Sequence, residues 1–211
     1  MVKRNLIIAD VETSGLDPED GCEVVQIYAR AINYWDLEDH ANGSFHAYIK
    51  PRRPEKAQAG ALKVIGEGWT KAQNEGLDPE VVWYQFFDWC HSINPTGKAS
   101  DKPIMFAHNQ DFDRKYIEFH GKENKVVKKS KFGWEYPWAW IFDSMGIAHF
   151  IFESDPDMEN LKLDTVINKL GLKRANPDIH DAKEDVDLLT EFVKRAYKYS
   201  RACYKKMKIT Q

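Results

Sequence analysis

Two carboxylates lie two residues apart in the run Leu-Ile-Ile-Ala-Asp-Val-Glu, which begins at Leu6 and ends at Glu12. Side chains alternate between the two faces of a strand, so Asp10 and Glu12 project from the same face. Adjacent ionised acids repel each other and are costly to desolvate, unless a divalent cation binds both or one acid holds a proton. The pair therefore predicts a metal site. An edge strand with solvated acids is the alternative, but the apolar run before Asp10 favours a strand covered on both faces.

A third acid, Asp113, lies in the first turn of an expected helix. The apolar stretch 104–107 is typical of a short buried strand, and Asn109 is a residue type that often begins a helix. Asp113 is therefore expected near the carboxyl end of that strand, where open α/β sheets bind ligands. Asp111 and Asp113 could instead only complement the helix dipole. We accept that interpretation for Asp111 and favour a site role for Asp113.

A fourth acid, Asp185, lies one turn inside the expected last helix. Asp181, with Glu184 three residues later, is an acidic variant of the capping box that begins such a helix. Asp185 precedes Leu189 by four residues and so shares the inward, apolar face. An inward acid with no basic partner nearby in sequence calls for a cation. His180 lies just before the helix, although a capped helix with a surface histidine explains that spacing equally well.

A sheet and several helices must bring these residues together. Besides the first strand, the sequence predicts strands over 24–35, 44–49, 104–107 and 141–143, and helices over 79–93, after Asn109, over 161–170 and over 182–199. Strands first, followed by strands that alternate with helices, predict an α/β fold with a mixed five-stranded sheet flanked by helices. No internal repeat or linker is evident, so we expect a single domain over residues 1–211.

The composition is that of an ordinary globular protein: 43% of the 211 residues are hydrophobic, 30% are charged, and the formal net charge is -3. This balance neither indicates nor excludes nucleic-acid binding, because bound metals restore positive potential at a carboxylate site. Cys22, Cys90 and Cys203 match no metal-binding spacing and are expected to be reduced thiols. No signal peptide or membrane-spanning run is evident, so we expect an intracellular, cytoplasmic protein.

Residues 122–140 combine lysines with aromatic side chains and are expected to be an insertion in the domain. The lysines could contact phosphates while the aromatic side chains stack on bases. Alternatively, the lysines are solvated and the aromatic side chains pack on the domain, which is the commoner situation for tryptophan. The basic stretch 194–208 is expected to be the solvated end of the last helix.

In order along the chain, these segments resemble the histidine subgroup of the DEDD family of 3′-to-5′ exonucleases. Residues 10–18 (Asp-Val-Glu-Thr-Ser-Gly-Leu-Asp-Pro) are similar to the family's D-x-E-T-T-G-L motif, with Ser14 as a departure. Residues 108–113 match its H-N-x-x-F-D motif, and residues 180–185 match its H-x-A-x-x-D motif. The resemblance extends from about residue 5 to about residue 193.

The resemblance implies a ribonuclease H-like fold, similar to that of proofreading exonuclease domains, and a two-metal site. The implied ligands of two Mg²⁺ or Mn²⁺ ions, about 3.5–4 Å apart, are Asp10, Glu12, Asp113 and Asp185. His180 is implied as the general base, since imidazole titrates near neutral pH. Contacts to the terminal nucleotide are implied for Thr13, Ser14, Leu16 and Asn109.

The implied activity releases 5′-mononucleotides from the 3′ ends of single-stranded nucleic acid, with DNA favoured. An oligoribonuclease or RNA 3′-end trimming exonuclease is the alternative, because the sequence does not report on a contact to the 2′-hydroxyl. A hydrolase of small phosphate esters and a catalytically silent binding module are more remote, since no carboxylate of the set is missing. A membrane is not expected as a partner. A polymerase or a second copy of the chain is undetermined, although the short segment after the last helix disfavours a stable polymerase subunit.

Overall fold

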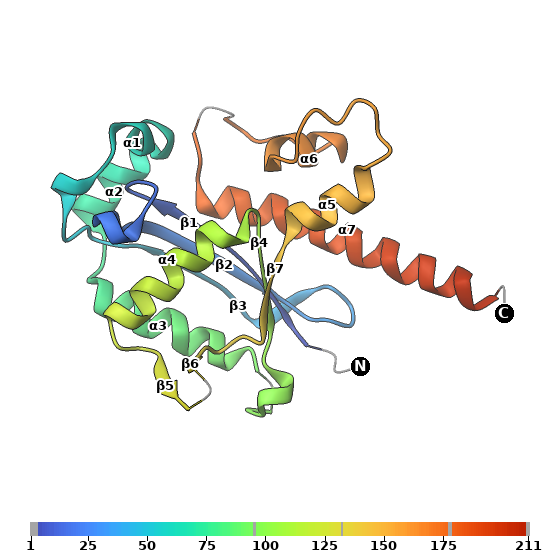
Figure 1. The fold of residues 1–211 in the computed structure, drawn as a ribbon, viewed down its shortest axis with the longest axis horizontal. Coiled ribbons are helices and arrows are strands. Elements are labelled where there is room, and N and C mark those ends of the chain that lie inside the picture. The colour runs from blue at the N-terminus through green and yellow to red at the C-terminus, as the bar shows by residue number, and fades with distance from the viewer. Residues whose placement is uncertain (1–3, 95, 132, 177–178, 210–211) are drawn as a thin grey trace.

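The computed structural model describes residues 4–94, 96–131, 133–176 and 179–209 (Figure 1). Its strands are β1 (Leu6–Thr13), β2 (Val24–Ile32), β3 (Asp39–Tyr48), β4 (Ile104–Ala107), β5 (Lys128–Ser130), β6 (Gly133–Glu135) and β7 (Trp140–Asp143). Its α-helices are α1 (Ala59–Ile65), α2 (Glu67–Glu75), α3 (Pro79–Ser92), α4 (Gln110–Glu123), α5 (Ser144–Phe152), α6 (Leu163–Lys169) and α7 (Ala182–Ile209). Across these residues, no helix is both long and apolar enough to cross a membrane.

Five strands form one mixed sheet in the order β3-β2-β1-β4-β7. The β1 strand pairs antiparallel with β2 and parallel with β4, while β7 pairs parallel with β4 and β3 pairs antiparallel with β2. The predicted α/β class and the mixed five-stranded sheet are thus confirmed. The β1 strand is central, and its residues enter core clusters on both faces of the sheet, which explains its almost wholly apolar sequence.

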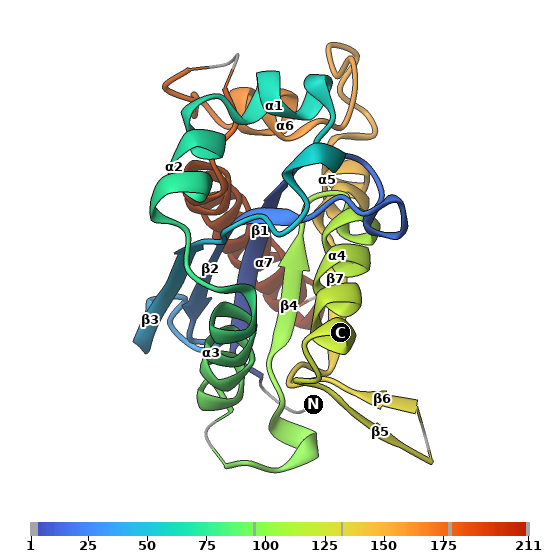
Figure 2. The same ribbon diagram turned by 90° about the vertical axis from the view of Figure 1, so that its left-hand side faces the viewer.

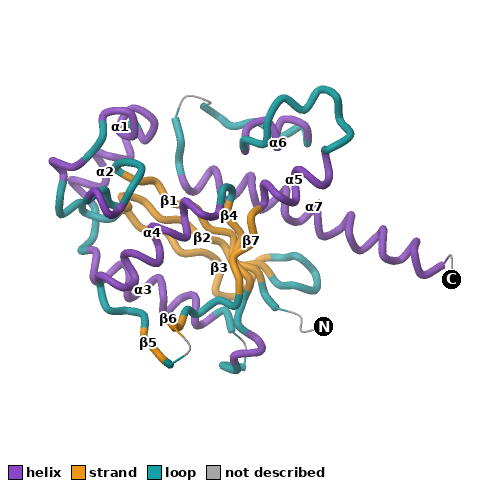
Figure 3. Tube along the Cα trace, viewed as in Figure 1, coloured by secondary structure: helices purple, strands orange, loops and turns teal. Residues whose placement is uncertain are grey.

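Helices cover both faces of the sheet (Figures 1 and 2). Ile7 of β1 belongs to the core cluster with Phe86 of α3, whereas Ile8 belongs to the cluster with Leu189 of α7. Side-chain alternation along β1 therefore places Asp10, two residues after Ile8, on the face that α7 covers. The α4 helix lies between β4 and β7 along the chain (Figure 3), and both strands run parallel to β1 and end at the same edge.

Some elements differ from the prediction. No helix is predicted over 59–75, yet α1 and α2 occupy this stretch and pack on β2 through Ile65 and Ala72. With 7 and 9 residues, these helices are too short for a helical period to show in the sequence. The α7 helix continues to Ile209, past the expected limit near Tyr199, and so includes the basic stretch 194–208 that was expected to form the end of the last helix. Its alanines and lysines are good helix formers.

The stretch 122–140 comprises the end of α4, the β5–β6 hairpin and the approach to β7. Trp138 is buried in the core and stacks on Tyr136, with ring centroids 5.2 Å apart. Trp134 on β6 is instead 41% exposed, and the Nζ atom of Lys122 lies 5.7 Å from its ring. Packing, the expected alternative to base stacking, thus holds for Trp138 and not for Trp134.

The hairpin lies far from the carboxyl edge of the sheet. Phe132, which follows Lys131 in sequence, is outside the described residues. The α4 helix starts at the carboxyl end of β4, and its 14 residues span about 20 Å before the hairpin begins at its other end (Figure 2). Any contact that Trp134 makes with nucleic acid is therefore remote from Asp113.

Candidate active site

The β1 strand carries Asp10 and Glu12 to its carboxyl end. Asp10 lies opposite Tyr28 and Glu12 opposite Gln26 of β2, and the pairing register shifts between Glu12 and Thr13. Such an irregularity ends regular pairing and redirects the strand. The Glu12 side chain is buried, whereas Asp10 keeps partial exposure to solvent.

The start of α4 supplies Asp113, which is buried beside β1. Its Oδ1 atom accepts a hydrogen bond from the backbone N–H of Val11 (3.1 Å), between the two acids of β1. Asp111, two residues earlier, is exposed and pairs with Arg114 at 2.9 Å. The structure thus separates the two aspartates as predicted, since only Asp113 faces the sheet.

Asn109 precedes α4 in a left-handed backbone conformation, with φ of 65°. Asparagine tolerates this conformation better than most residues. Asn109 is thus the N-cap residue of α4, as its residue type predicts, although its side chain makes no capping hydrogen bond. The backbone N–H of Asn109 donates instead to Oδ1 of Asp143 at the end of β7 (3.1 Å).

The first turn of α7 contributes Asp185, which is buried, and His180 lies on the connection before it. Oδ2 of Asp185 lies 3.3 Å from Nδ1 of His180. Asp181 caps the helix, because its Oδ1 accepts from the backbone N–H of Glu184 (3.1 Å). The capping box is only half formed, since the Glu184 carboxylate accepts from the N–H of Ala175 (2.6 Å) instead of reaching back to Asp181.

These segments meet in one cluster. Glu12, His180 and Asp185 each offer a donor atom, and these atoms all lie within 4.8 Å of one another. Asp10 and Asp113 adjoin the cluster, and the negative charges of Asp113 and Asp185 act on Asp10 strongly enough to shift its pKa. The donors are mainly carboxylate oxygens, the ligands preferred by hard cations such as Mg²⁺ and Mn²⁺. The residues present therefore fit a divalent metal.

Burial and mutual repulsion change the protonation of the acids. Burial, followed by the charges of Asp113, Asp185 and Glu12, raises the pKa of Asp10 well above its ordinary value. Burial, followed by the charge of Asp185, raises the pKa of Glu12 to about 7. Burial also raises the pKa of Asp113. The metal-free cluster therefore tends to hold protons near neutral pH, as expected for acids that share a site.

The sequence reasoning missed Arg174, which reaches the cluster from the loop between α6 and α7. Its Nη1 atom forms an ion pair with Oδ1 of Asp185, and its Nε atom lies 3.0 Å from Oδ1 of Asp164. Asp185 has no basic partner nearby in sequence, but the fold brings Arg174 to it. The sequence carried little signal for this contact, because Arg174 lies in an irregular loop with no helical or strand period.

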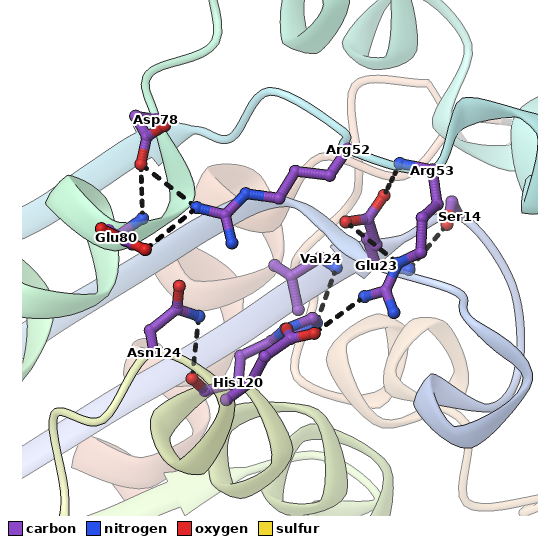
Figure 4. A network of polar contacts seen from close by, with 10 residues as sticks. Ser14, Glu23, Val24, Arg52, Arg53, Asp78, Glu80, His120 and Asn124 are labelled. Atoms are coloured by element: carbon purple, nitrogen blue, oxygen red, sulfur yellow. Dashed lines mark hydrogen bonds and ion pairs between the residues drawn. The ribbon is translucent and has the colours of Figure 1, made fainter.

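Hydrogen bonds within the chain hold the loop that follows β1 (Figure 4). The Ser14 N–H donates to the carbonyl of Glu23 (2.8 Å), and its Oγ accepts from the Glu23 N–H (2.8 Å). The Glu23 carboxylate accepts from the N–H of Arg53 (2.7 Å), whose guanidinium reaches Glu123 (3.3 Å).

The carbonyls of this loop also have partners. Gln58 donates its N–H to the carbonyl of Ser14 (2.7 Å), and Gly15 accepts from the hydroxyl of Tyr116 (2.8 Å). Both backbone groups of Ser14 are therefore engaged within the chain. Leu16, next in the loop, is 73% exposed. The loop thus presents an apolar side chain on a rigid support.

Comparison with known proteins finds sequence similarity to exonucleases. No family model matches the chain. The chain is 24% identical over 190 residues to the 3′-5′ exonuclease DinG of Bacillus subtilis (strain 168), an alignment that covers 89% of this chain and 17% of DinG. It is 26% identical over 187 residues to the DNA polymerase III subunit epsilon of Rickettsia typhi, covering 88% of this chain and 70% of that protein.

Solved structures share the fold. The structure of E. coli exonuclease I in complex with a dT13 oligonucleotide has a TM-score of 0.73 and 16% sequence identity, over 97% of this chain and 43% of that one. A 3′-exonuclease that recognises the histone mRNA stem-loop has a TM-score of 0.66 and 16% identity, over 92% and 64%. The chain therefore has the fold of these exonuclease structures, and its sequence is similar to those of the exonuclease DinG and of the polymerase III epsilon subunit.

Proposed function

We propose that this chain hydrolyses the terminal phosphodiester bond at the 3′ end of single-stranded nucleic acid and releases 5′-mononucleotides. The observation that carries the proposal is the group formed by Glu12, His180 and Asp185 beside Asp10 and Asp113, at one edge of the sheet. Asp10 and His180 are partly exposed, so a strand end can approach the cluster from solvent.

The four acids are the proposed metal ligands. Asp10, Glu12, Asp113 and Asp185 would hold two Mg²⁺ or Mn²⁺ ions, which when bound neutralise charge on the phosphate and lower the pKa of water. The hydrogen bond from Val11 orients Asp113, and the β1 backbone sets the spacing of Asp10 and Glu12. The chain thus supplies a prearranged set of oxygen donors.

His180 is the proposed general base, which would assign the chain to the histidine subgroup of the family. Its Nδ1 faces Asp185, and its side chain is 40% exposed. Contact with a buried carboxylate orients the imidazole, as in other acid–base sites. Its hydrogen bond with Asp185 raises the pKa of His180, so the neutral form that accepts a proton predominates only above the ordinary histidine range.

The loop after β1 and the start of α4 form the proposed binding site of the terminal nucleotide. Leu16 is exposed on a loop whose Thr13 hydroxyl donates to the Gly15 carbonyl (2.7 Å), so its side chain can pack on a base without loss of loop entropy. Ser14 would contribute indirectly, because its hydroxyl holds the loop in place. The Asn109 side chain makes no capping hydrogen bond, so its amide could contact the terminal nucleotide at the same edge of the sheet.

DNA is the favoured substrate, and RNA is the alternative. One structure with this fold binds a DNA oligonucleotide and another recognises an RNA stem-loop, so the fold accommodates either sugar. The test is digestion of 5′-labelled single-stranded DNA and of its RNA counterpart with Mg²⁺, Mn²⁺ or EDTA. We expect a metal-dependent ladder that shortens from the 3′ end, faster for DNA, and no ladder with Asp10→Ala.

The same digestion tests the other functions. Intact strands under every metal condition would overturn the exonuclease proposal and favour a binding module. Hydrolysis of nucleotide esters without polarity on oligonucleotides would indicate a small-molecule phosphoesterase. Near-normal digestion by Asp10→Ala would overturn the assignment of the site.

A further inference from the structure

Arg174 lies between α6 and α7 with its guanidinium among the acids that begin both helices. Its Nε lies 3.0 Å from Oδ1 of Asp164, and its Nη1 pairs with Asp185 and lies 3.8 Å from Oε2 of Glu184. The side chain is only 2% exposed, and within the described residues its Nη2 makes no hydrogen bond. Arginine stays protonated in proteins, so a permanent positive charge is buried beside the carboxylate cluster.

The two oxygens of Asp185 have different neighbours. Oδ1 pairs with Arg174, and Oδ2 lies 3.3 Å from Nδ1 of His180. The same carboxylate belongs, with Glu12 and His180, to the group of donors within 4.8 Å of one another. A divalent cation at Asp185 therefore approaches the guanidinium closely, and two cations that share one buried carboxylate repel each other strongly.

We propose that Arg174 is a built-in counter-cation that sets the affinity of the site for divalent metal. In the metal-free chain it offsets part of the cluster's negative charge and holds Asp185 toward the site. When metal binds Asp185, Asp164 and Glu184 remain as partners of the guanidinium. This inference deepens the proposed function and rests on it. Its consequence is weaker metal binding than the four acids alone would produce, so the site fills only where divalent metal is abundant.

A purely structural clamp between α6 and α7 predicts the opposite effect. If Arg174 only held these helices together, its loss would loosen the site and weaken metal binding. If Arg174 is a counter-cation, its neutralisation removes repulsion and strengthens metal binding, while the metal-free protein becomes less stable because the acids lose their compensating charge. Metal affinity and metal-free stability then change in opposite directions.

The experiment measures Mn²⁺ binding to the full chain by isothermal titration calorimetry, without substrate, together with melting temperature in EDTA. The variants are Arg174→Gln, Arg174→Lys and the control Arg195→Gln. Arg195 also joins α7 to α6, but through the carbonyl of Leu170 (2.7 Å). We expect Arg174→Gln to bind Mn²⁺ at least about fivefold more tightly and to melt at a lower temperature in EDTA. Arg174→Lys keeps the charge and should stay near the wild-type affinity, as should Arg195→Gln.

The outcomes separate this inference from the proposed function. No Mn²⁺ binding by the wild-type chain would overturn the metal site itself. Wild-type binding with equal or weaker binding by Arg174→Gln would overturn the counter-cation. If Arg174→Gln does not fold in EDTA, the Mn²⁺ affinity of Arg174→Lys decides the question. An affinity equal to that of the wild type supports a role for the positive charge. A weaker affinity indicates a structural clamp that needs the two-pronged geometry of the guanidinium.

Discussion

The backbone N–H of Val11 donates to Oδ1 of Asp113 at 3.1 Å, which joins the strand carrying Asp10 and Glu12 to the helix carrying the third acid. This bond links residues far apart in sequence at the point where the proposed metal ligands converge. It makes the orientation of Asp113 part of the fold, so charge and hydrogen bonding at this position can be separated by mutation.

Asp113→Asn removes the charge but keeps an oxygen that can accept from Val11, whereas Asp113→Ala also leaves the buried N–H without a partner. We expect both variants to lose nuclease activity, and only Asp113→Ala to lose about 1–3 kcal/mol of stability. Chemical denaturation in EDTA measures the stability and a digestion assay the activity. Asp111→Asn is the matched control, because Asp111 is exposed in the same turn. An active Asp113→Asn protein would remove Asp113 from the proposed ligand set.

The metal-free protein should lose stability as the pH rises toward neutrality. Burial and the charge of Asp185 raise the pKa of Glu12 to about 7, so the folded state holds a proton that the unfolded chain releases at lower pH. This contribution to stability is complete below about pH 4.5 and is lost as the pH rises through about 7. Calorimetry in EDTA between these values measures the decline.

Glu12→Gln is the control for this pH dependence, since it cannot ionise, and its stability should vary less over the same interval. Adding Mg²⁺ above neutral pH should raise the melting temperature of the wild type, because bound metal replaces the protons. A wild-type stability that increases between pH 5 and 7 in EDTA would contradict the raised pKa of Glu12.

The pH–rate profile should report His180. The hydrogen bond that His180 donates to Asp185, together with the charge of that carboxylate, raises the pKa of His180 above its usual value. A general base acts in its neutral form, so the single-turnover rate should rise with pH, with its midpoint above about 6.5. His180→Gln should lower the rate by about 10²–10⁴-fold and remove this rise. A flat wild-type profile with chemistry limiting would argue against the assignment.

Trp134 offers a test of the β5–β6 hairpin as a contact for longer strands. Stacking of a base on an exposed tryptophan is worth about 1–3 kcal/mol, and Trp134 is exposed beside Lys122. Trp134→Ala should therefore weaken binding of a long single strand and leave hydrolysis of a trinucleotide unchanged, because the hairpin is remote from the cluster. Fluorescence anisotropy measures the binding. Trp35→Ala, another exposed tryptophan, is the control, and equal affinities of both variants would exclude the hairpin.

Local spacing in the sequence was enough to predict where many of the acidic side chains of the site lie. The period of two residues along a strand placed Asp10 and Glu12 together, and the helical period separated Asp113 from Asp111 and turned Asp185 inward. The alternation of strands and helices likewise predicted the mixed sheet, because each element buries its own apolar side chains. These features depend on neighbours within a few residues, which is the range over which a sequence pattern is informative.

Other contacts in the site depend on tertiary structure alone, including the ion pairs between its charged residues. Arg174 reaches Asp185 and Asp164 from an irregular loop, and Asn109 enters α4 in a left-handed conformation fixed by Asp143. The hairpin lies at the far end of α4, and this position depends on how that helix packs. Contacts of this kind join segments with no shared period, so their geometry follows from the packing of the whole chain and not from local spacing.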